Sequence, residues 1–165
     1  MILIVLRTFC RSRITINYKF SKSSWISTLK LSTLWCCFSV RNIAIVNIKG
    51  TLTPQEYVLL GRQYTISEWV KRGYKEMVLR KGTISDDEAG EIGYATTIRL
   101  LRMREGEKYG HVSEVDAGIE STELWSHMKN DPKIEELETE IEKVFKEELE
   151  ELMATERGYP KAIAK

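Results

Sequence analysis

The sequence predicts a mainly α-helical protein, built from short helices packed as a bundle with one long amphipathic helix near the C-terminus. Three observations carry this prediction. Helix-capping signals recur through the middle of the chain, and apolar residues recur there at a spacing of three or four positions. A glutamate-rich stretch near the C-terminus shows the same apolar spacing over a greater length.

Length and composition limit the possible classes of protein. The 165 residues suffice for one domain, or for one small domain with tails, and 42% hydrophobic residues can build its core. A net charge of +1 argues against general binding to nucleic acids or to anionic membranes. Cys10, Cys36 and Cys37 form no disulfide framework, which favours a reducing intracellular compartment, cytoplasmic or nuclear.

Residues 1–22 form a basic N-terminal extension. Residues 1–55 contain eight basic residues and no acid. The apolar run at the start ends at Arg7, so it is too short for a transmembrane helix or a typical signal-peptide core. Residues 1–30 loosely fit a mitochondrial transit peptide, whereas period-two alternation over 13–20 predicts a short strand. Both interpretations stay open, beside that of a frayed extension.

A helical domain is expected over residues 23–105, and its first two helices precede Gly50. Ser23 or Ser24 can cap the first helix, whose apolar face extends to about residue 34. The second helix is expected over residues 39–49, with Gly50 suited to its C-terminal stop. Its expected buried side comprises Val40, Ile43, Ala44 and residues 46–48.

Three capping boxes mark the next helices. In a capping box a Ser or Thr side chain caps the helix, and a Glu three residues later bonds back to the cap residue. The sequence predicts this pairing for Thr53 with Glu56, Thr65 with Glu68, and Ser85 with Glu88. Pro54 strengthens the first prediction because proline suits the first helical position.

Apolar stripes are expected on the helices that follow. One stripe continues to Leu79, and it comprises Trp69, Val70, Tyr74, Met77 and Val78. The chain then breaks at Gly82, and a short helix ends near Gly93. A further helix is expected over residues 94–104, with Ile98, Leu100, Leu101 and Met103 on its apolar side. Arg99, Arg102 and Arg104 are expected on its polar side, paired with nearby acids.

The C-terminal part is expected to combine an irregular linker with a long helix. The linker covers residues 106–130 and has room for one short helix over 121–128. Asp131 can cap the long helix over 131–153, whose stripe comprises Ile134, Leu137, Ile141, Phe145, Leu149 and Leu152. Packing inside the domain, or weakly on a partner, is favoured over a coiled coil, because three heptads are marginal. Residues 154–165 are expected to form a tail.

The sequence predicts no catalytic, cofactor-binding or metal-ligating residue, so a non-catalytic protein is expected. His111 and His127 lie 16 residues apart with no cysteine near them. The neighbours Cys36 and Cys37 point in different directions on a helix. The acids over 86–88 are better explained by the capping box than by a carboxylate site, and no nucleophile stands beside a base.

Aromatic and basic residues allow other interpretations. Core packing is favoured for the large side chains, and the expected core comprises Trp25, Leu29, Trp35, Ile43, Tyr64 and Trp69. Exposed rings would instead mark an interface. The basic residues before residue 50 could bind nucleic acid, but no specific nucleic acid and no membrane is expected as a partner.

An ordered series of motifs resembles a known family. The segments are SWISTLKLSTLW over 24–35, VRNIAI over 40–45, LTP over 52–54, GRQYTISEW over 61–69, GY at 73–74, ISDDEA over 84–89, IG at 92–93 and IRLLRMRE over 98–105. Together they are similar to the region that follows the BTB/POZ core in a family of mushroom-type fungal BTB proteins. The resemblance implies a post-BTB (BACK-like) set of short helices, with no catalytic residues to transfer.

The chain departs from the family pattern in two places. About 23 residues precede the matching region, too few for a BTB core, and Cys36-Cys37 stands where the family usually has more polar residues. The resemblance therefore implies a truncated BTB-family protein that interacts with protein partners of unknown identity. Recruitment of a cullin-type ubiquitin ligase scaffold is implied only if a BTB core is present. The runner-up function is a mitochondrially targeted or nucleic-acid-associated protein led by the basic N-terminus.

Overall fold

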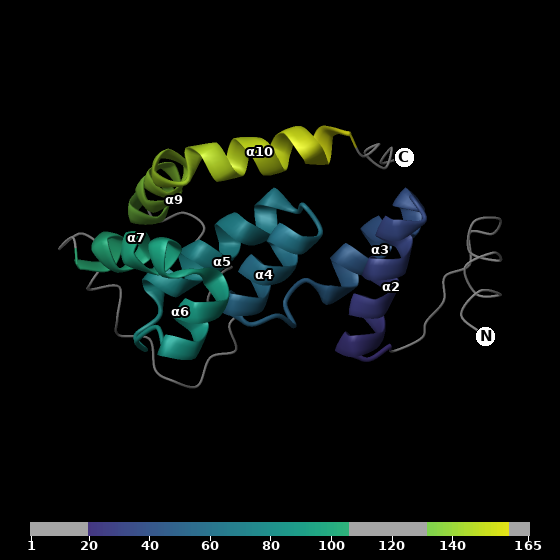
Figure 1. Ribbon diagram of the computed structural model, residues 1–165, viewed down its shortest axis with the longest axis horizontal. Coiled ribbons are helices and arrows are strands. Elements are labelled where there is room, and N and C mark those ends of the chain that lie inside the picture. Colours follow the sequence, from purple (N-terminus) through teal and green to yellow (C-terminus); the bar gives the residue numbers. More distant parts are fainter. Residues whose placement is uncertain (1–19, 106–131, 159–165) are drawn as a thin grey trace. The chain divides into compact units, whose positions relative to one another are not determined.

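The computed structural model describes residues 20–105 and 132–158, and every regular element within them is a helix. The elements are α2 (Lys22–Leu34), α3 (Phe38–Ile48), α4 (Pro54–Gln63), α5 (Ser67–Leu79), α6 (Asp86–Ile92), α7 (Tyr94–Glu105), α9 (Pro132–Val144) and α10 (Lys146–Arg157) (Figure 1). The prediction of a mainly α-helical fold is confirmed. The chain divides into two compact units, Met1–Thr51 with Arg157–Lys165, and Leu52–Glu156.

The first unit is a pair of helices that pack on each other, α2 and α3. The cap of α2 is Ser21, whose side chain accepts a hydrogen bond from the backbone N–H of Ser24. The predicted cap, Ser23 or Ser24, was therefore placed two to three residues too late. Gly50 follows α3 with a φ of 94°, a left-handed conformation that glycine adopts without strain.

The buried residues of the first unit include part of the predicted core. Leu29, Val40, Ala44 and Ile48 are buried, and Trp25 and Ile43 are half-buried. The prediction was wrong for Trp35, which is 44% exposed, and for Val46, which is 70% exposed. Trp35 lies just after the last residue of α2, at its C-cap, so the helical spacing that predicts burial no longer applies there.

The second unit begins with a confirmed capping box at α4. The Thr53 side chain accepts from the backbone N–H of Glu56, and the Glu56 carboxylate accepts from the backbone N–H of Thr53. The predicted box at Thr65 is wrong. Thr65 has a φ of 51°, and its hydroxyl donates to the carbonyl of Tyr64. The N-cap of α5 is instead Ile66, which has no capping side chain.

Helices α4 and α5 approach closely because each contributes a glycine to their contact. A Cβ on Gly61 would lie 2.7 Å from the Val70 side chain. A Cβ on Gly73 would lie 2.6 Å from the Val58 side chain and 2.8 Å from the carbonyl oxygen of Pro54. A Cβ atom does not fit at these distances, so the close packing of α4 on α5 requires glycine at both positions.

The predicted stripe on α5 is confirmed as core. Trp69, Val70, Tyr74, Met77 and Val78 are all buried. Tyr64 is buried too, and the Trp69 ring packs edge-on against Tyr57, with 6.0 Å between ring centroids. The capping box of α6, Ser85 with Glu88, is confirmed by both of its hydrogen bonds.

The single C-terminal helix predicted over 131–153 is two helices that meet at Phe145. Figure 1 shows the chain changing direction between α9 and α10. The amide of Phe145 still donates to the carbonyl of Ile141, and that of Leu149 to the carbonyl of Phe145, so the junction is a local bend. The helical region continues to Arg157, four residues beyond the predicted end.

The sequence left open whether the C-terminal helix packs within the domain or on a partner, and α9 and α10 pack within the second unit. Leu137, Ile141, Phe145 and Leu149 belong to one buried cluster with residues of α4, α5, α6 and α7. Phe145 stacks on Tyr74, with ring centroids 4.1 Å apart. The amphipathic stripe is therefore covered by the chain's own helices.

Several predictions lie outside the described residues. They are the strand over 13–20 apart from Phe20, the linker over 106–130 with its short helix over 121–128, the Asp131 cap, both histidines, and the tail from residue 159 onward. The predicted domain over 23–105 includes helices of both units, and the helices after residue 131 pack with residues 52–105.

Candidate functional site

A dense polar cluster in the described part of the second unit is centred on Arg62, at the C-terminal end of α4. All three guanidinium nitrogens of Arg62 donate hydrogen bonds. Nε donates to Glu148 (2.7 Å), Nη1 to the carbonyl of Ile92 (2.5 Å), and Nη2 to the Tyr74 hydroxyl (2.9 Å) and Thr96 Oγ1 (3.0 Å). The Tyr74 hydroxyl in turn donates to the second carboxylate oxygen of Glu148 at 2.8 Å. The cluster thus connects α4, α5, α6, α7 and α10.

The electrostatics of this cluster keep the Arg62 guanidinium charged and the Tyr74 hydroxyl neutral. Burial lowers the pKa of Arg62, but hydrogen bonding to Glu148 and the neighbouring charges outweigh it, so the pKa is raised. Burial raises the pKa of the Tyr74 hydroxyl well above its ordinary value, and Glu148 raises it further. Tyr74 therefore remains a neutral donor near neutral pH, which suits a structural hydrogen bond better than proton transfer.

The Arg62 cluster has no signal in local sequence. Glu148 lies 86 residues from Arg62, and nothing in the neighbourhood of either residue indicates the pairing. Burial and a full set of partners are what an arginine inside a helical bundle requires. We interpret the cluster as a structural clasp that holds α10 to the helices before it.

Acidic residues of α9 and α10 pair with basic and polar groups of α5. Lys71 Nζ lies 2.6 Å from Glu142, and Lys75 forms an ion pair with Glu138. Glu156 accepts hydrogen bonds from the backbone N–H (3.3 Å) and the hydroxyl (2.6 Å) of Ser67. Glu156 therefore accepts the hydrogen bonds at the N-terminus of α5, the capping role that the sequence predicted for Thr65.

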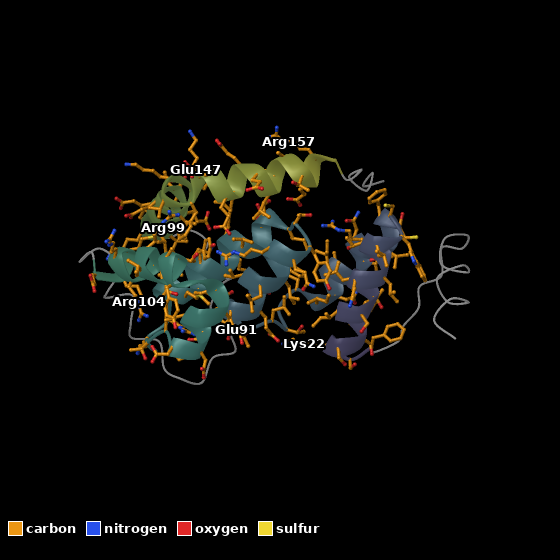
Figure 2. All side chains as sticks on the ribbon, in the orientation of Figure 1. Lys22, Glu91, Arg99, Arg104, Glu147 and Arg157 are labelled. Carbon is orange, nitrogen blue, oxygen red and sulfur yellow. The ribbon has the colours of Figure 1, made fainter. Side chains whose placement is uncertain are left out.

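The loop between α5 and α6 is fastened by a second charged group. Arg80 forms two hydrogen bonds to the Glu88 carboxylate, at 2.7 and 2.5 Å. Arg104, at the end of α7, donates to the carbonyls of Gly82 and Arg80, both at 2.9 Å (Figure 2). Hydrogen bonding to Arg80 lowers the pKa of Glu88 to about 2, so this capping carboxylate is ionised under ordinary conditions.

Within the described ranges, the residues considered as metal ligands or catalytic groups do not form a common site. No group of three or more His, Cys, Asp or Glu residues that could hold a metal ion occurs within 20–105 and 132–158. Cys36 is exposed and Cys37 is half-buried, in the turn between α2 and α3. Glu88 is engaged in the capping box and with Arg80, as the capping interpretation of residues 86–88 predicts.

Helix α7 carries an exposed apolar ridge, which we define as Tyr94, Ile98 and Leu101. These side chains are 64%, 49% and 38% exposed. Their spacing of four and three residues places them on one face of the helix. The prediction that Ile98 and Leu101 share one apolar side of the helix with Leu100 and Met103 is wrong. The buried positions of α7 are Thr97, Leu100 and Met103, whose face is centred about a third of a turn away around the helix.

The arginines of α7 are not paired with acids in the part of the chain that the structure describes. The Arg99 guanidinium lies over the Phe145 ring, 5.8 Å from its centroid. Arg104 bonds to carbonyl oxygens, and Arg102 is exposed without an ion pair within residues 20–105 or 132–158. The predicted pairing with nearby acids is therefore wrong for these residues. Helical spacing places Arg102 beside the ridge and Glu105 on the ridge face, whereas Arg99 is directed to Phe145.

The first unit also exposes large apolar side chains. Leu34 and Val46 are 71% and 70% exposed. Trp35, which follows Leu34 at the end of α2, is 44% exposed. Phe20 packs edge-on against Trp25, with 5.1 Å between ring centroids. The charged residues over 20–51 are all basic, comprising Lys22, Lys30, Arg41 and Lys49.

None of the helices within 20–105 and 132–158 is long and apolar enough to cross a membrane. Comparison with protein-family models, with curated proteins and with solved structures finds no match for the chain.

Proposed function

We propose that this chain is a non-catalytic protein–protein interaction module. The observation that carries the proposal is the ridge of α7, where Tyr94, Ile98 and Leu101 are exposed at helical spacing. Single exposed apolar residues are normal on protein surfaces, but a set aligned on one helix face is typical of a partner surface.

The polar groups of the second unit support the same proposal. The guanidinium nitrogens of Arg62 and the two Nη atoms of Arg80 donate to groups within these clusters and to the backbone. A catalytic site needs groups left available for a substrate, with protonation states matched to proton transfer. Interaction therefore fits the available surface better than catalysis.

The family resemblance gives this proposal its more specific form. In that form the chain is a truncated BTB-family protein, and its helices are the region that follows a BTB core. Its partners are other proteins in the cytoplasm or nucleus. A cullin-type scaffold is among them only if a BTB core is joined to the chain. Sequencing of the transcript upstream of Met1 tests this form directly, because the proposal expects an in-frame BTB core there.

The general proposal is tested by quantitative affinity capture with the full chain. The bait is compared with an Ile98→Ser variant, and with a Leu34→Ser/Trp35→Ser variant of the first unit. We expect at least one protein to be enriched with the wild-type chain and lost with one of the variants. Failure to enrich any protein over both variants would refute an interaction function.

The alternative function rests on the basic N-terminal part. No acid precedes Glu56, so a mitochondrial address or a nucleic-acid contact remains the second candidate. A fluorescent fusion that lacks residues 1–22 separates the two proposals. Loss of mitochondrial localisation on deletion supports the alternative, and unchanged localisation supports the interaction module. For nucleic acid, an affinity that does not fall with salt would exclude the alternative.

A further inference from the structure

We propose that the first unit binds the surface of a lipid membrane that contains acidic phospholipids, with the end of α2 entering the headgroup layer. The inference goes beyond the proposed interaction function and concerns a different surface from α7. The binding surface comprises Lys30, Leu34 and Trp35, all of which are exposed. Charge and apolar contact together recognise such a membrane, without selection of one particular headgroup.

The two units of the chain carry opposite charge. The sequence of the first unit has eight basic residues in 1–51 and three in 157–165, and no Asp or Glu in either range. Of the 25 basic and 24 acidic residues in the chain, 14 basic and all 24 acidic residues therefore belong to the second unit. The net charge of +1, from which no membrane binding was expected, is the sum of +11 and −10. A unit with only basic side chains is attracted to acidic phospholipids.

Basic and apolar side chains lie together at the exposed end of α2. Lys30 and Leu34 are four residues apart, so they lie on one side of the helix. Leu34 is 71% exposed, and Trp35, at the C-cap of α2, is 44% exposed. A lysine on such a surface can lay its apolar stem among the apolar groups while its ammonium reaches a lipid phosphate. On α3, Val46 is 70% exposed, and the exposed Lys49 follows three residues later.

The core of the first unit is formed without these exposed side chains. Leu29, Val40, Ala44 and Ile48 are buried, and α2 packs on α3. Insertion of Leu34 into a headgroup layer would therefore remove apolar area from water without a change of fold.

The apolar side chains favour a lipid surface over nucleic acid as the anionic ligand. Interfaces with nucleic acid are polar, and they place charged or aromatic side chains against phosphates and bases. Leu34 gains little from a phosphate, whereas in the headgroup layer it loses its contact with water. Trp35 suits the same layer, because an indole ring has an apolar body and one N–H donor.

Cosedimentation of the full chain with lipid vesicles tests the proposal. Vesicles of phosphatidylcholine with about 30% phosphatidylserine are compared with vesicles of phosphatidylcholine alone. We expect the chain to bind the mixed vesicles at least about tenfold more tightly than the neutral ones. The affinity should also fall as salt rises from about 0.1 M to about 0.5 M. Equal binding to both kinds of vesicle, or binding to neither, would overturn the proposal.

Matched variants locate the binding surface. Leu34→Ser/Trp35→Ser and Lys30→Glu are each expected to weaken binding to the mixed vesicles about tenfold. Ile98→Ser, which changes an apolar side chain that is 49% exposed on the second unit, should alter the affinity less than about twofold. Circular dichroism checks that every variant is folded. A loss with Ile98→Ser as large as that with Leu34→Ser/Trp35→Ser would contradict the proposed surface.

An environment-sensitive dye reports which part of the chain enters the lipid. In a chain with Cys10→Ser and Cys37→Ser, the remaining thiol is Cys36, which is exposed and follows Trp35. A nitrobenzoxadiazole dye coupled there should brighten and shift to shorter wavelength on mixed vesicles. The same dye at Ile98→Cys, in a chain with all three native cysteines replaced by serine, should not change. A shift at position 98 alone would place the contact on α7.

Three further results would assign the surface or the binding elsewhere and overturn the proposal. Tighter binding to an oligonucleotide than to mixed vesicles, weakened by Lys30→Glu and not by Leu34→Ser/Trp35→Ser, would make nucleic acid the ligand. A concentration-dependent dimer that forms without lipid and is abolished by Leu34→Ser/Trp35→Ser would assign the surface to a second copy. Vesicle binding that survives both variants and disappears when residues 1–19 are removed would assign it to the basic extension.

Discussion

Two apolar stripes in the second unit have the same spacing and opposite surroundings. On α9 and α10, Ile134, Leu137, Ile141, Phe145 and Leu149 are all buried. On α7, Tyr94, Ile98 and Leu101 are exposed, although they are separated by the same intervals of three or four residues. The first stripe is flanked by glutamates that pair with lysines. The second lies beside Arg102, which has no acidic partner in the described residues.

The difference arises because α7 has two faces with apolar residues and the fold can bury only one of them. Leu100 and Met103 pack in the core. The face that carries Tyr94, Ile98 and Leu101 is centred about a third of a turn away, and it is therefore exposed to solvent. Spacing indicates which residues share a face, but it does not say which face the rest of the chain covers. The exposed stripe is therefore the surface that the fold leaves available to a partner.

The largest expected effect comes from removing the residue at the bend of the buried stripe. Phe145→Ala should lower the free energy of unfolding by about 3–5 kcal/mol, because it leaves a cavity beside Tyr74. Ile98→Ala on the exposed stripe should change it by less than about 0.5 kcal/mol. Urea denaturation followed by circular dichroism measures both. Similar losses for the two variants would show that α7 is buried in solution.

A smaller effect is expected where α4 meets α5. Gly73→Ala should destabilise the protein by about 1–3 kcal/mol, because the added methyl group overlaps Val58 and the Pro54 carbonyl. Gly90 in α6 is the matched control, since a Cβ there meets nothing within 4 Å. Gly90→Ala should stabilise the protein by about 0.5–1 kcal/mol through helix propensity. A neutral Gly73→Ala would contradict the close contact of α4 and α5.

The clasp at Arg62 is expected to contribute next. Tyr74→Phe removes one hydroxyl from the cluster and should cost about 1–2 kcal/mol. A double-mutant cycle with Glu148→Gln should show a coupling of about 0.5 kcal/mol or more, since the two side chains share Arg62. Strictly additive effects on the urea midpoint would show that the cluster does not act as one unit.

The smallest effect is a dependence of stability on pH. Arg80 lowers the pKa of Glu88 from its ordinary value of 4.5 to about 2, so the folded state favours the ionised carboxylate. This contribution is complete above about pH 4.5 and is lost as the pH falls toward 2. Glu88→Gln should therefore lower stability by up to about 1 kcal/mol at pH 7. The gap to the wild-type chain should narrow as the pH falls from about 4.5 to about 2, and a constant gap would contradict the assignment.

Local signals in the sequence predicted the parts of the fold that depend on neighbouring residues. The capping boxes at Thr53 and Ser85 and the stripe on α5 are confirmed, because each involves residues within a few turns of one helix. The same reasoning failed at Thr65, where the start of α5 is served by Glu156, 89 residues after Ser67. A partner so distant in sequence is not visible to local capping rules.

The candidate surface was harder to predict than the helices. Residues 94–104 were expected to be helical, but Ile98 and Leu101 were placed on one apolar side with Leu100 and Met103, and the arginines in ion pairs. The Arg62 clasp was missed because its members come from helices separated by long stretches of sequence. Contacts of this kind follow from tertiary packing, which periodicity and capping signals do not contain.

The exposure of one stripe and the burial of the other can be measured directly by thiol labelling. Ile98→Cys and Ile141→Cys are placed separately in a chain in which Cys10, Cys36 and Cys37 are replaced by serine. We expect the thiol at position 98 to react at nearly the rate of an unstructured peptide. The thiol at position 141 should react at least about a hundredfold more slowly, because it requires local opening. Equal rates, or protection of position 98, would contradict the claim that α7 presents a free apolar surface.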